Sequence, residues 1–143
     1  MTELDWLLTN LAGAVNGVRY AVILSPDGLT LGRSPEVGEE AAGSLAALVA
    51  GVQSLARGAG QSFDCGEVNQ TIVQMDDLLL FIIPAGRGTC LALLAEATAD
   101  AGQIAYEMAV LIKRVGQHMI ANPRFPVQNT VVQNTVAQNT VAR

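Results

Sequence analysis

The sequence predicts an α/β domain of the α+β type, in which three helices cover one five-stranded antiparallel sheet. Three observations predict this fold. Segments with helical and strand periodicity follow one another in the order α-β-β-α-β-β-β-α. The last three strand-like runs are joined by short turns, which favour antiparallel neighbours. Two of these runs are apolar throughout, as in strands covered on both faces. The expected elements are a helix over 2–16, strands over 18–25 and 29–33, a helix over 36–59, strands over 65–75, 78–83 and 90–95, and a helix over 100–121.

The first helix and the hairpin after it have clear boundary signals. Thr2 and Asp5 are spaced as in a capping box. Trp6 lies on the face opposite the apolar stripe, which consists of Leu4, Leu7, Leu8, Leu11, Ala12 and Val15. The Pro-Asp-Gly sequence at 26–28 is a turn signal between two β-rich runs, so 18–33 is expected to form a hairpin.

The helix predicted over 36–59 has two unlike faces at about 100° per residue. A bulky face, expected to lie on the sheet, carries Leu45, Leu48, Val49, Val52, Leu55 and Ala56. A small, uncharged face carries Gly43, Ala47, Gly51, Ser54 and Gly58, flanked by Ala46 and Ala50. A soluble helix usually turns a charged face to water, and glycines within a helix each cost up to about 1 kcal/mol relative to alanine. An ordinary alanine-rich surface is one interpretation; the one we favour is a contact between two copies of the chain.

The strand predicted over 65–75 supports that interpretation. It carries the polar residues Glu67, Asn69, Gln70 and Gln74, as an edge strand would, and an open edge can pair with another chain. The expected dimer interface therefore consists of Gly43, Ala47, Ala50, Gly51, Ser54, Gly58, Glu67, Asn69 and Thr71.

Contacts with a further protein partner are expected beside the small face, at Glu39, Gln53 and Arg57. Trp6 is another candidate, because an exposed tryptophan is a frequent binding anchor. The alternative is that Trp6 packs over the adjacent N-terminus.

The last helix has an apolar stripe, and a segment of different character follows it. Ile104, Met108, Leu111, Val115 and Met119 form the stripe, and Asn122-Pro123 ends the helix. We therefore expect one domain over 1–123 and a tail over 124–143. The tail repeats a Val-Gln-Asn-Thr-Val pattern with a period of five residues from Val127, which predicts a low-complexity, disordered extension. Addition of this segment as a strand to an open sheet edge is the alternative.

Composition excludes several classes of function. Half of the 143 residues are hydrophobic, yet no run reaches the roughly 20 apolar residues of a membrane span. The N-terminus lacks the features of a signal peptide, so we expect a cytoplasmic protein without membrane insertion. A net charge of −5 with eight scattered basic residues argues against nucleic acid. Cys65 and Cys90 are expected to be reduced thiols in the core.

The sequence carries no recognisable catalytic, cofactor-binding or metal site, so we do not expect an enzyme. His118 has no signature that connects it to a nucleophile, and residues 85–89 precede a strand rather than the helix of a phosphate-binding loop. Asp76-Asp77 and 85–89 are interpreted as turns.

The pattern as a whole resembles the roadblock (dynein light chain) family, in the bacterial branch that partners small Ras-like GTPases. The resemblance covers about 2–121 and rests on the order of elements and on the segments LDWLLTNLAGAVNGVRYAVILSPDGL, GEVNQTIVQMDDLLLFIIPAGRGTCLALLA and AYEMAVLIKRV. The sequence is similar to roadblock proteins of the bacterial gene clusters called conservons. These clusters also encode a sensor-kinase-like protein, a small companion protein and a GTPase.

The resemblance implies a sheet with the second helix on one face and the first and third on the other. It also implies a homodimer that pairs strand 65–75 with its copy and places both second helices together on one face. A small Ras-like GTPase is the implied partner, within a complex that includes the sensor-kinase-like protein. Neither Arg57 nor Arg87 is expected to supply a catalytic arginine. A structural adaptor with no effect on nucleotide turnover is the alternative function.

Overall fold

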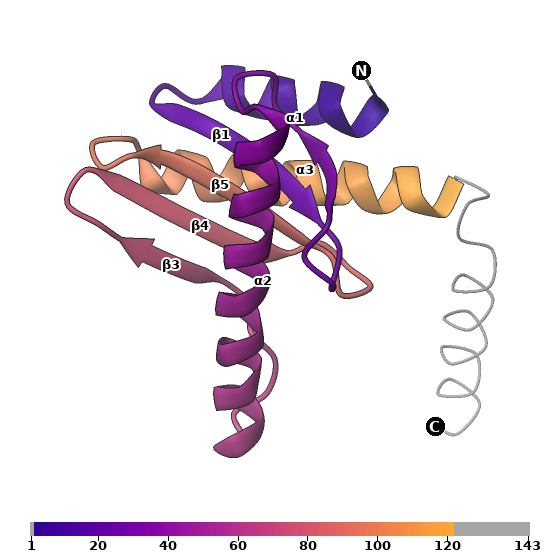
Figure 1. Cartoon of the computed structure of the whole chain (residues 1–143), viewed down its shortest axis with the longest axis vertical. Helices are drawn as coiled ribbons and strands as arrows, with labels where there is room; N and C mark the ends of the chain where they lie inside the picture. Colours follow the sequence, from indigo (N-terminus) through magenta and orange to yellow (C-terminus); the bar gives the residue numbers. More distant parts are fainter. Residues whose placement is uncertain (1, 122–143) are drawn as a thin grey trace.

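The computed structural model describes the backbone of residues 2–121 and the side chains of residues 2–117, with the elements in the predicted order (Figure 1). The repeat tail and the side chains of His118 and Met119 lie outside the described residues. The elements are α1 (Glu3–Ala14), β1 (Val18–Leu24), β2 (Thr30–Arg33), α2 (Glu39–Ser62), β3 (Thr71–Gln74), β4 (Leu78–Pro84), β5 (Cys90–Glu96) and α3 (Ala101–Ala121).

The five strands form one sheet in the order β2-β1-β5-β4-β3. Every neighbouring pair is antiparallel, so the predicted fold class is confirmed. The apolar strands β4 and β5 lie in the interior of the sheet, whereas β2 and β3 form its two edges.

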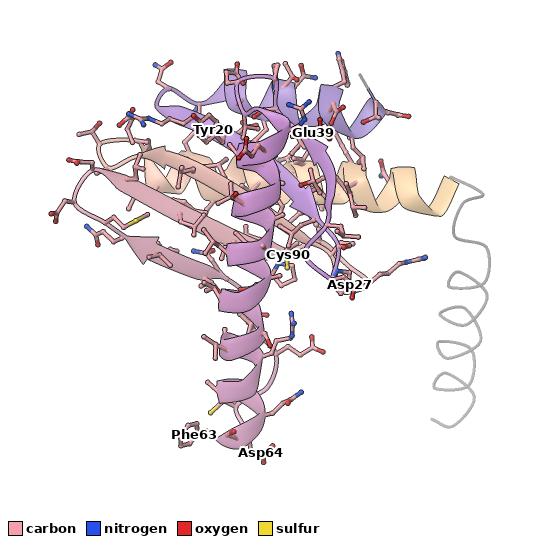
Figure 2. The ribbon with its side chains drawn as sticks, in the orientation of Figure 1. Tyr20, Asp27, Glu39, Phe63, Asp64 and Cys90 are labelled. Carbon is pink, nitrogen blue, oxygen red and sulfur yellow. The ribbon has the colours of Figure 1, made fainter. Side chains whose placement is uncertain are left out.

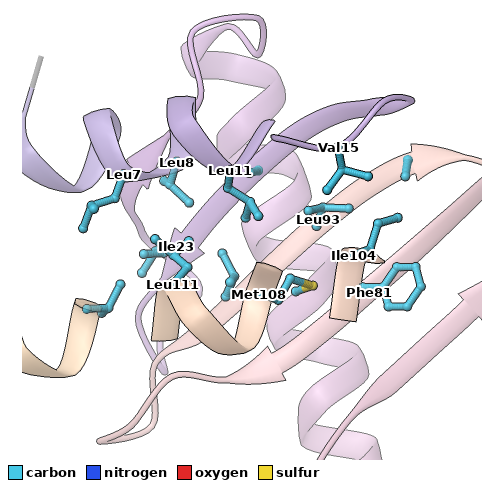
Figure 3. Close-up of a cluster of buried hydrophobic side chains, with 14 of the residues drawn as sticks. Leu7, Leu8, Leu11, Val15, Ile23, Phe81, Leu93, Ile104, Met108 and Leu111 are labelled. Atoms are coloured by element: carbon cyan, nitrogen blue, oxygen red, sulfur yellow. The ribbon is translucent and has the colours of Figure 1, made fainter. Parts of the chain in front are cut away.

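Two apolar clusters lie on opposite faces of this sheet. On one face, α1 and α3 pack against the side chains of Ile23, Phe81 and Leu93 (Figure 3). On the other face, α2 packs against Val22, Ile82 and their neighbours. The single helix on one face and the two helices on the other agree with the arrangement that the family resemblance implies.

The predicted capping box at the start of α1 is confirmed, and it also connects the helix to the sheet. The Asp5 backbone N–H donates to the Thr2 hydroxyl, and the Thr2 backbone N–H donates to the Asp5 carboxylate, both at 3.1 Å. The other oxygen of Asp5 accepts the backbone N–H of Arg33, in the edge strand β2, at 2.7 Å.

The strand predicted over 65–75 is shorter in the structure, where β3 begins only at Thr71. The Cys65 N–H donates to the Gly60 carbonyl, and Gly66 has a φ of +90°, so this part of the chain turns instead of extending. The partner strand β4 also ends at Pro84, which has no N–H to continue a ladder. Glu67 and Asn69 therefore precede the edge strand and are not part of it, which corrects the prediction.

Helix α2 begins and ends three residues later than predicted, at Glu39 and Ser62. No helix among the described residues is long and apolar enough to cross a membrane.

Candidate protein-binding surfaces

Helix α2 turns a different side to the sheet from the one predicted. Its buried line consists of Ala42, Ala46, Val49 and Gln53. Leu48 and Leu55, expected on the sheet, are 67% and 78% exposed. The prediction placed the larger side chains of α2 on the sheet. In the structure the inner side is made mostly of small residues, and these allow α2 to lie close to the sheet. The outward side is therefore wider and more apolar than predicted.

The turn between β1 and β2 accounts for part of the small-residue face. Gly28 has a φ of +83°, and a Cβ placed there would lie 3.3 Å from the Cβ of Ala50. The backbone of Ala47 would be 3.5 Å from the same position. Ala50, predicted to lie in the dimer interface, is half-buried against this turn, so its small side chain already has a role within one protomer.

Three of the four glycines of α2 have no such role within the described part of the protomer. A Cβ added at Gly43, Gly51 or Gly58 would meet nothing within 4 Å. Ala47 and Ser54 are exposed beside them. Because alanine would favour the helix at these positions, the protomer's own packing gives no reason for glycine there.

Gln53 was expected to contact a partner, but its side chain is only 2% exposed, which corrects that prediction. Its Oε1 accepts the hydroxyl hydrogen of Thr71 at 2.7 Å and so connects α2 to β3. Thr71 is half-buried, and its hydroxyl is directed towards α2. What Thr71 offers to a partner is the open backbone edge of β3.

A pocket of about 390 Å³ lies beside Gln53, between the C-terminal half of α2, residues 66–68 and the turn between β4 and β5. Arg57, Glu67 and Cys90 are among its lining residues. Burial raises the pKa of the Cys90 thiol, against the lowering effects of a hydrogen bond with Gln53 and the charge of Arg57. The thiol is therefore neutral at pH 7 and a poor nucleophile.

Of the two cysteines, only Cys90 is a core thiol. Cys65 is exposed, at the turn that follows α2, so the expectation of two core thiols is wrong for this residue. Both thiols are free. Among the described residues, no group of three or more His, Cys, Asp or Glu side chains could hold a metal ion.

A second, more open hollow of about 650 Å³ lies beside the N-terminal half of α2. Its apolar lining comes from Leu45 and Leu48 on α2, Tyr20 on β1 and Leu94 on β5. We call it the Tyr20–Leu94 groove. The sequence did not reveal this groove, because the size of Leu48 favoured a place in the core for it. Ala42, Ala46, Val49 and Gln53 are three or four residues apart and share one face of the helix. Had this face been assigned to the sheet, Leu48 would have been predicted to lie outside.

The remaining partner-binding candidates are exposed but far apart. Glu39 is the first residue of α2, and Arg57 lies 18 residues further, about 27 Å along the helix axis. Trp6 is 53% exposed on α1, which covers the opposite face of the sheet. A partner at Trp6 would therefore occupy a different face from one at Glu39 or Arg57.

The α-β-β-α-β-β-β-α order around one antiparallel sheet, with an open edge strand and an uncovered apolar helix face, defines a small α+β domain with surface for another protein chain. The chain belongs to the Roadblock/LC7 family, because the model of the Roadblock/LC7 domain matches residues 4–95. Among curated proteins, none matches the chain.

Solved structures agree with this assignment. A Roadblock/LC7 domain from Streptomyces avermitilis is 43% identical, with 84% of this chain and 100% of that chain covered and a TM-score of 0.80. A second Roadblock/LC7 domain from the same organism is 34% identical, with 80% and 99% covered and a TM-score of 0.67. MglB of Myxococcus xanthus shares the fold at 13% identity, with 85% and 98% covered and a TM-score of 0.78.

Proposed function

We propose that this Roadblock/LC7 protein is a homodimer that binds a small Ras-like GTPase and modulates its nucleotide cycle. Membership of the family and the resemblance to its bacterial, GTPase-partnering branch support the choice of partner. We place the complex in the cytoplasm, together with the sensor-kinase-like protein that the family resemblance implies.

The outward side of α2 is the observation that carries the homodimer. It combines two exposed leucines, Leu48 and Leu55, with glycines that have open space around them. Exposed apolar surface of this kind is typical of protein–protein contacts. A second helix could approach closely over Gly51, since no side chain would separate the two backbones.

The edge strand β3 gives the second part of the proposed interface. Its outer backbone groups have no neighbouring strand in the described residues. Antiparallel pairing with the β3 of a second copy would satisfy these groups and continue the sheet across the dimer. Glu39 and Arg57 on α2 remain the proposed contacts for the GTPase, and Gln53 is no longer among them. Trp6, on the opposite face of the sheet, is the alternative contact.

The test compares the wild type with Gly51→Leu in a GTP hydrolysis and nucleotide exchange assay that uses a small Ras-like GTPase of the conservon type. Light scattering reports the oligomeric state in parallel. We expect a dimeric wild type that changes the nucleotide turnover, and a folded, monomeric Gly51→Leu chain with a weaker effect. Gly13→Leu is the control for the oligomeric state, because its side chain also enters open space, but on α1.

Four outcomes would contradict the proposal. A monomeric wild type, or a Gly51→Leu chain that stays dimeric, would exclude the α2 interface. No binding to the GTPase would exclude it as the partner. Binding without any change in hydrolysis or exchange would indicate a structural adaptor.

A further inference from the structure

Helix α2 is longer than the sheet it crosses, and its C-terminal part extends past the edge strand (Figure 1). Gln53 marks the crossing, because its side chain is hydrogen-bonded to Thr71, the first residue of β3. Ten residues later comes Phe63, which follows the last residue of the helix. At 1.5 Å per residue, Phe63 lies about 15 Å beyond the crossing.

The aromatic ring of Phe63 has little cover in its own protomer. It is 78% exposed, at the far tip of α2 (Figure 2). Tyr20, on the floor of the Tyr20–Leu94 groove, lies near the other end of the helix in the same view. An exposed aromatic ring and an open apolar groove thus lie at opposite ends of one helix.

The spacing of β-strands connects these two features across a dimer. Antiparallel pairing of β3 with a second copy relates the protomers by a two-fold axis normal to the sheet, so both α2 helices lie on the same face. At about 4.8 Å per strand, the partner's β3, β4 and β5 lie about 5, 10 and 14 Å beyond this β3. The overhang of about 15 Å therefore ends above the partner's β5.

Strand β5 carries one half of the groove floor. Leu94 lies on β5 and pairs across the strands with Tyr20 on β1. Both side chains are half-buried and belong to the cluster on the α2 face. In such a dimer, the tip of α2 of one copy therefore ends over the apolar pair of the other copy.

We propose that Phe63 of each copy inserts into the Tyr20–Leu94 groove of the other, so that each groove is completed by the second copy of the chain. This inference rests on the proposed homodimer and names the contact that anchors it. The groove takes an aromatic ring because leucines and a tyrosine line it, and the two-fold axis gives each dimer two such contacts. The inserted ring would also cover Leu48, which is exposed in the protomer.

Cross-linking tests the contact directly. In a Cys65→Ser background, which removes the exposed thiol and leaves buried Cys90, Phe63→Cys is combined with Tyr20→Cys. Within one chain the two positions lie near opposite ends of a 24-residue helix, too far apart to be joined. A short bismaleimide, which spans the space of the two removed rings, should give covalent dimers from the double variant and from neither single variant.

Truncation tests its strength. Phe63→Ala removes both rings of the dimer, and we expect the dissociation constant to rise roughly 100-fold, about tenfold for each groove. Tyr106→Ala is the matched control, since Tyr106 is an exposed aromatic residue on α3, across the sheet, and its loss should leave the dimer unchanged.

The outcomes separate this inference from the proposed function. A monomeric wild type would overturn both. A dimeric wild type with no specific cross-link, or with no weakening by Phe63→Ala beyond that of Tyr106→Ala, would overturn the inference alone. A Phe63→Ala dimer of normal affinity that no longer binds the GTPase would also overturn it, because the GTPase would then be the occupant.

Discussion

Gln53 illustrates how one buried polar residue can fix the rotation of a helix. Its amide oxygen accepts the hydroxyl hydrogen of Thr71, and its side chain is also hydrogen-bonded to Cys90. A buried amide without partners would be costly, so these hydrogen bonds allow Gln53 to face the sheet together with Ala42, Ala46 and Val49 and favour this rotation of α2. That rotation turns Leu48 and Leu55 outward and creates the apolar surface on which the proposed dimer depends.

Removing the donor of this hydrogen bond should therefore destabilise the fold. Thr71→Val keeps the shape of the side chain but leaves the Gln53 oxygen without the hydroxyl, and we expect a loss of about 1–2 kcal/mol in the free energy of unfolding. Urea denaturation at a fixed protein concentration measures it. In the double variant Gln53→Leu with Thr71→Val, much of this loss should be recovered, since the amide and the hydroxyl are both gone and the Cys90 thiol, which loses its bond with Gln53, is a weak donor. If the loss of the double variant equalled the sum of the losses of the two single variants, this role of the hydrogen bond would be contradicted.

Asp5 should make the stability of the protein depend on pH. Burial by itself raises the pKa of this carboxyl group, but hydrogen bonds from the backbone of Arg33 and from Thr2 outweigh it, so the pKa is below its ordinary value. A carboxylate with a depressed pKa stabilises the folded state above its unfolded pKa of about 3.9, and this contribution is lost as the pH falls through the folded value.

Asp5→Asn removes this titration. We expect the variant to be less stable than the wild type at pH 7, with the difference shrinking as the pH falls below about 4. Thermal unfolding across this range checks it, with Glu3→Gln as the control for a charge in the same helical turn. A difference between Asp5→Asn and the wild type that stays constant with pH would contradict the assigned hydrogen bonds.

At the scale of elements, periodicity and turn signals were sufficient to predict the type and order of the helices and strands. The order of the eight elements and the antiparallel neighbours of β4 were predicted because each strand is short, apolar or alternating, and ends at a clear turn. The length of β3 was not predicted correctly. Neither the positive φ of Gly66 nor the end of the β3–β4 ladder at the pair Thr71 and Ile82 can be inferred from the composition of 65–75, which resembles a polar strand.

The candidate surfaces were predicted less well, because they depend on tertiary contacts. The sequence identified α2 as the surface helix with too little charge, and its glycines do face open space. It could not reveal that the turn at Gly28 packs on Ala50, or that Gln53 has a partner 18 residues away in Thr71. Both contacts decide which residues of α2 face the solvent. A prediction based on side-chain size alone therefore placed Leu48 and Leu55 on the wrong side of the helix.

The two hairpin turns at one end of the sheet should depend on each other. Gly88 has a φ of +79°, and a Cβ there would lie 2.6 Å from the Cγ of Pro26 in the other turn. Gly88→Ala should therefore destabilise the protein by more than the roughly 1 kcal/mol that a positive φ costs alanine. Gly86→Ala is the matched control, because Gly86 has a φ of +92° but nothing within 4 Å. Equal losses of the free energy of unfolding would show that the contact with Pro26 contributes nothing.

For the molecule as a whole, the side of the sheet that has only one helix exposes a line of apolar side chains along that helix. Leu48, Leu55 and Phe63 all belong to α2 or to its end, and each is more than half exposed. On the opposite face, α1 and α3 together bury the side chains of the central strands. A protein with such unequal coverage gains stability when a second copy covers the open face, because folding and association then bury apolar surface together.

The melting temperature of the wild type should therefore rise with protein concentration. A dimer that unfolds to two free chains gains about 1.4 kcal/mol for each tenfold increase in concentration, which corresponds to about 2 °C for two chains of this size. Scanning calorimetry over two or three decades of concentration measures the slope. Gly51→Leu, which we expect to be monomeric, should show no slope, whereas Gly13→Leu should keep that of the wild type. A melting temperature of the wild type that does not change with concentration would mean that the uncovered face of α2 is stable in water without a second copy.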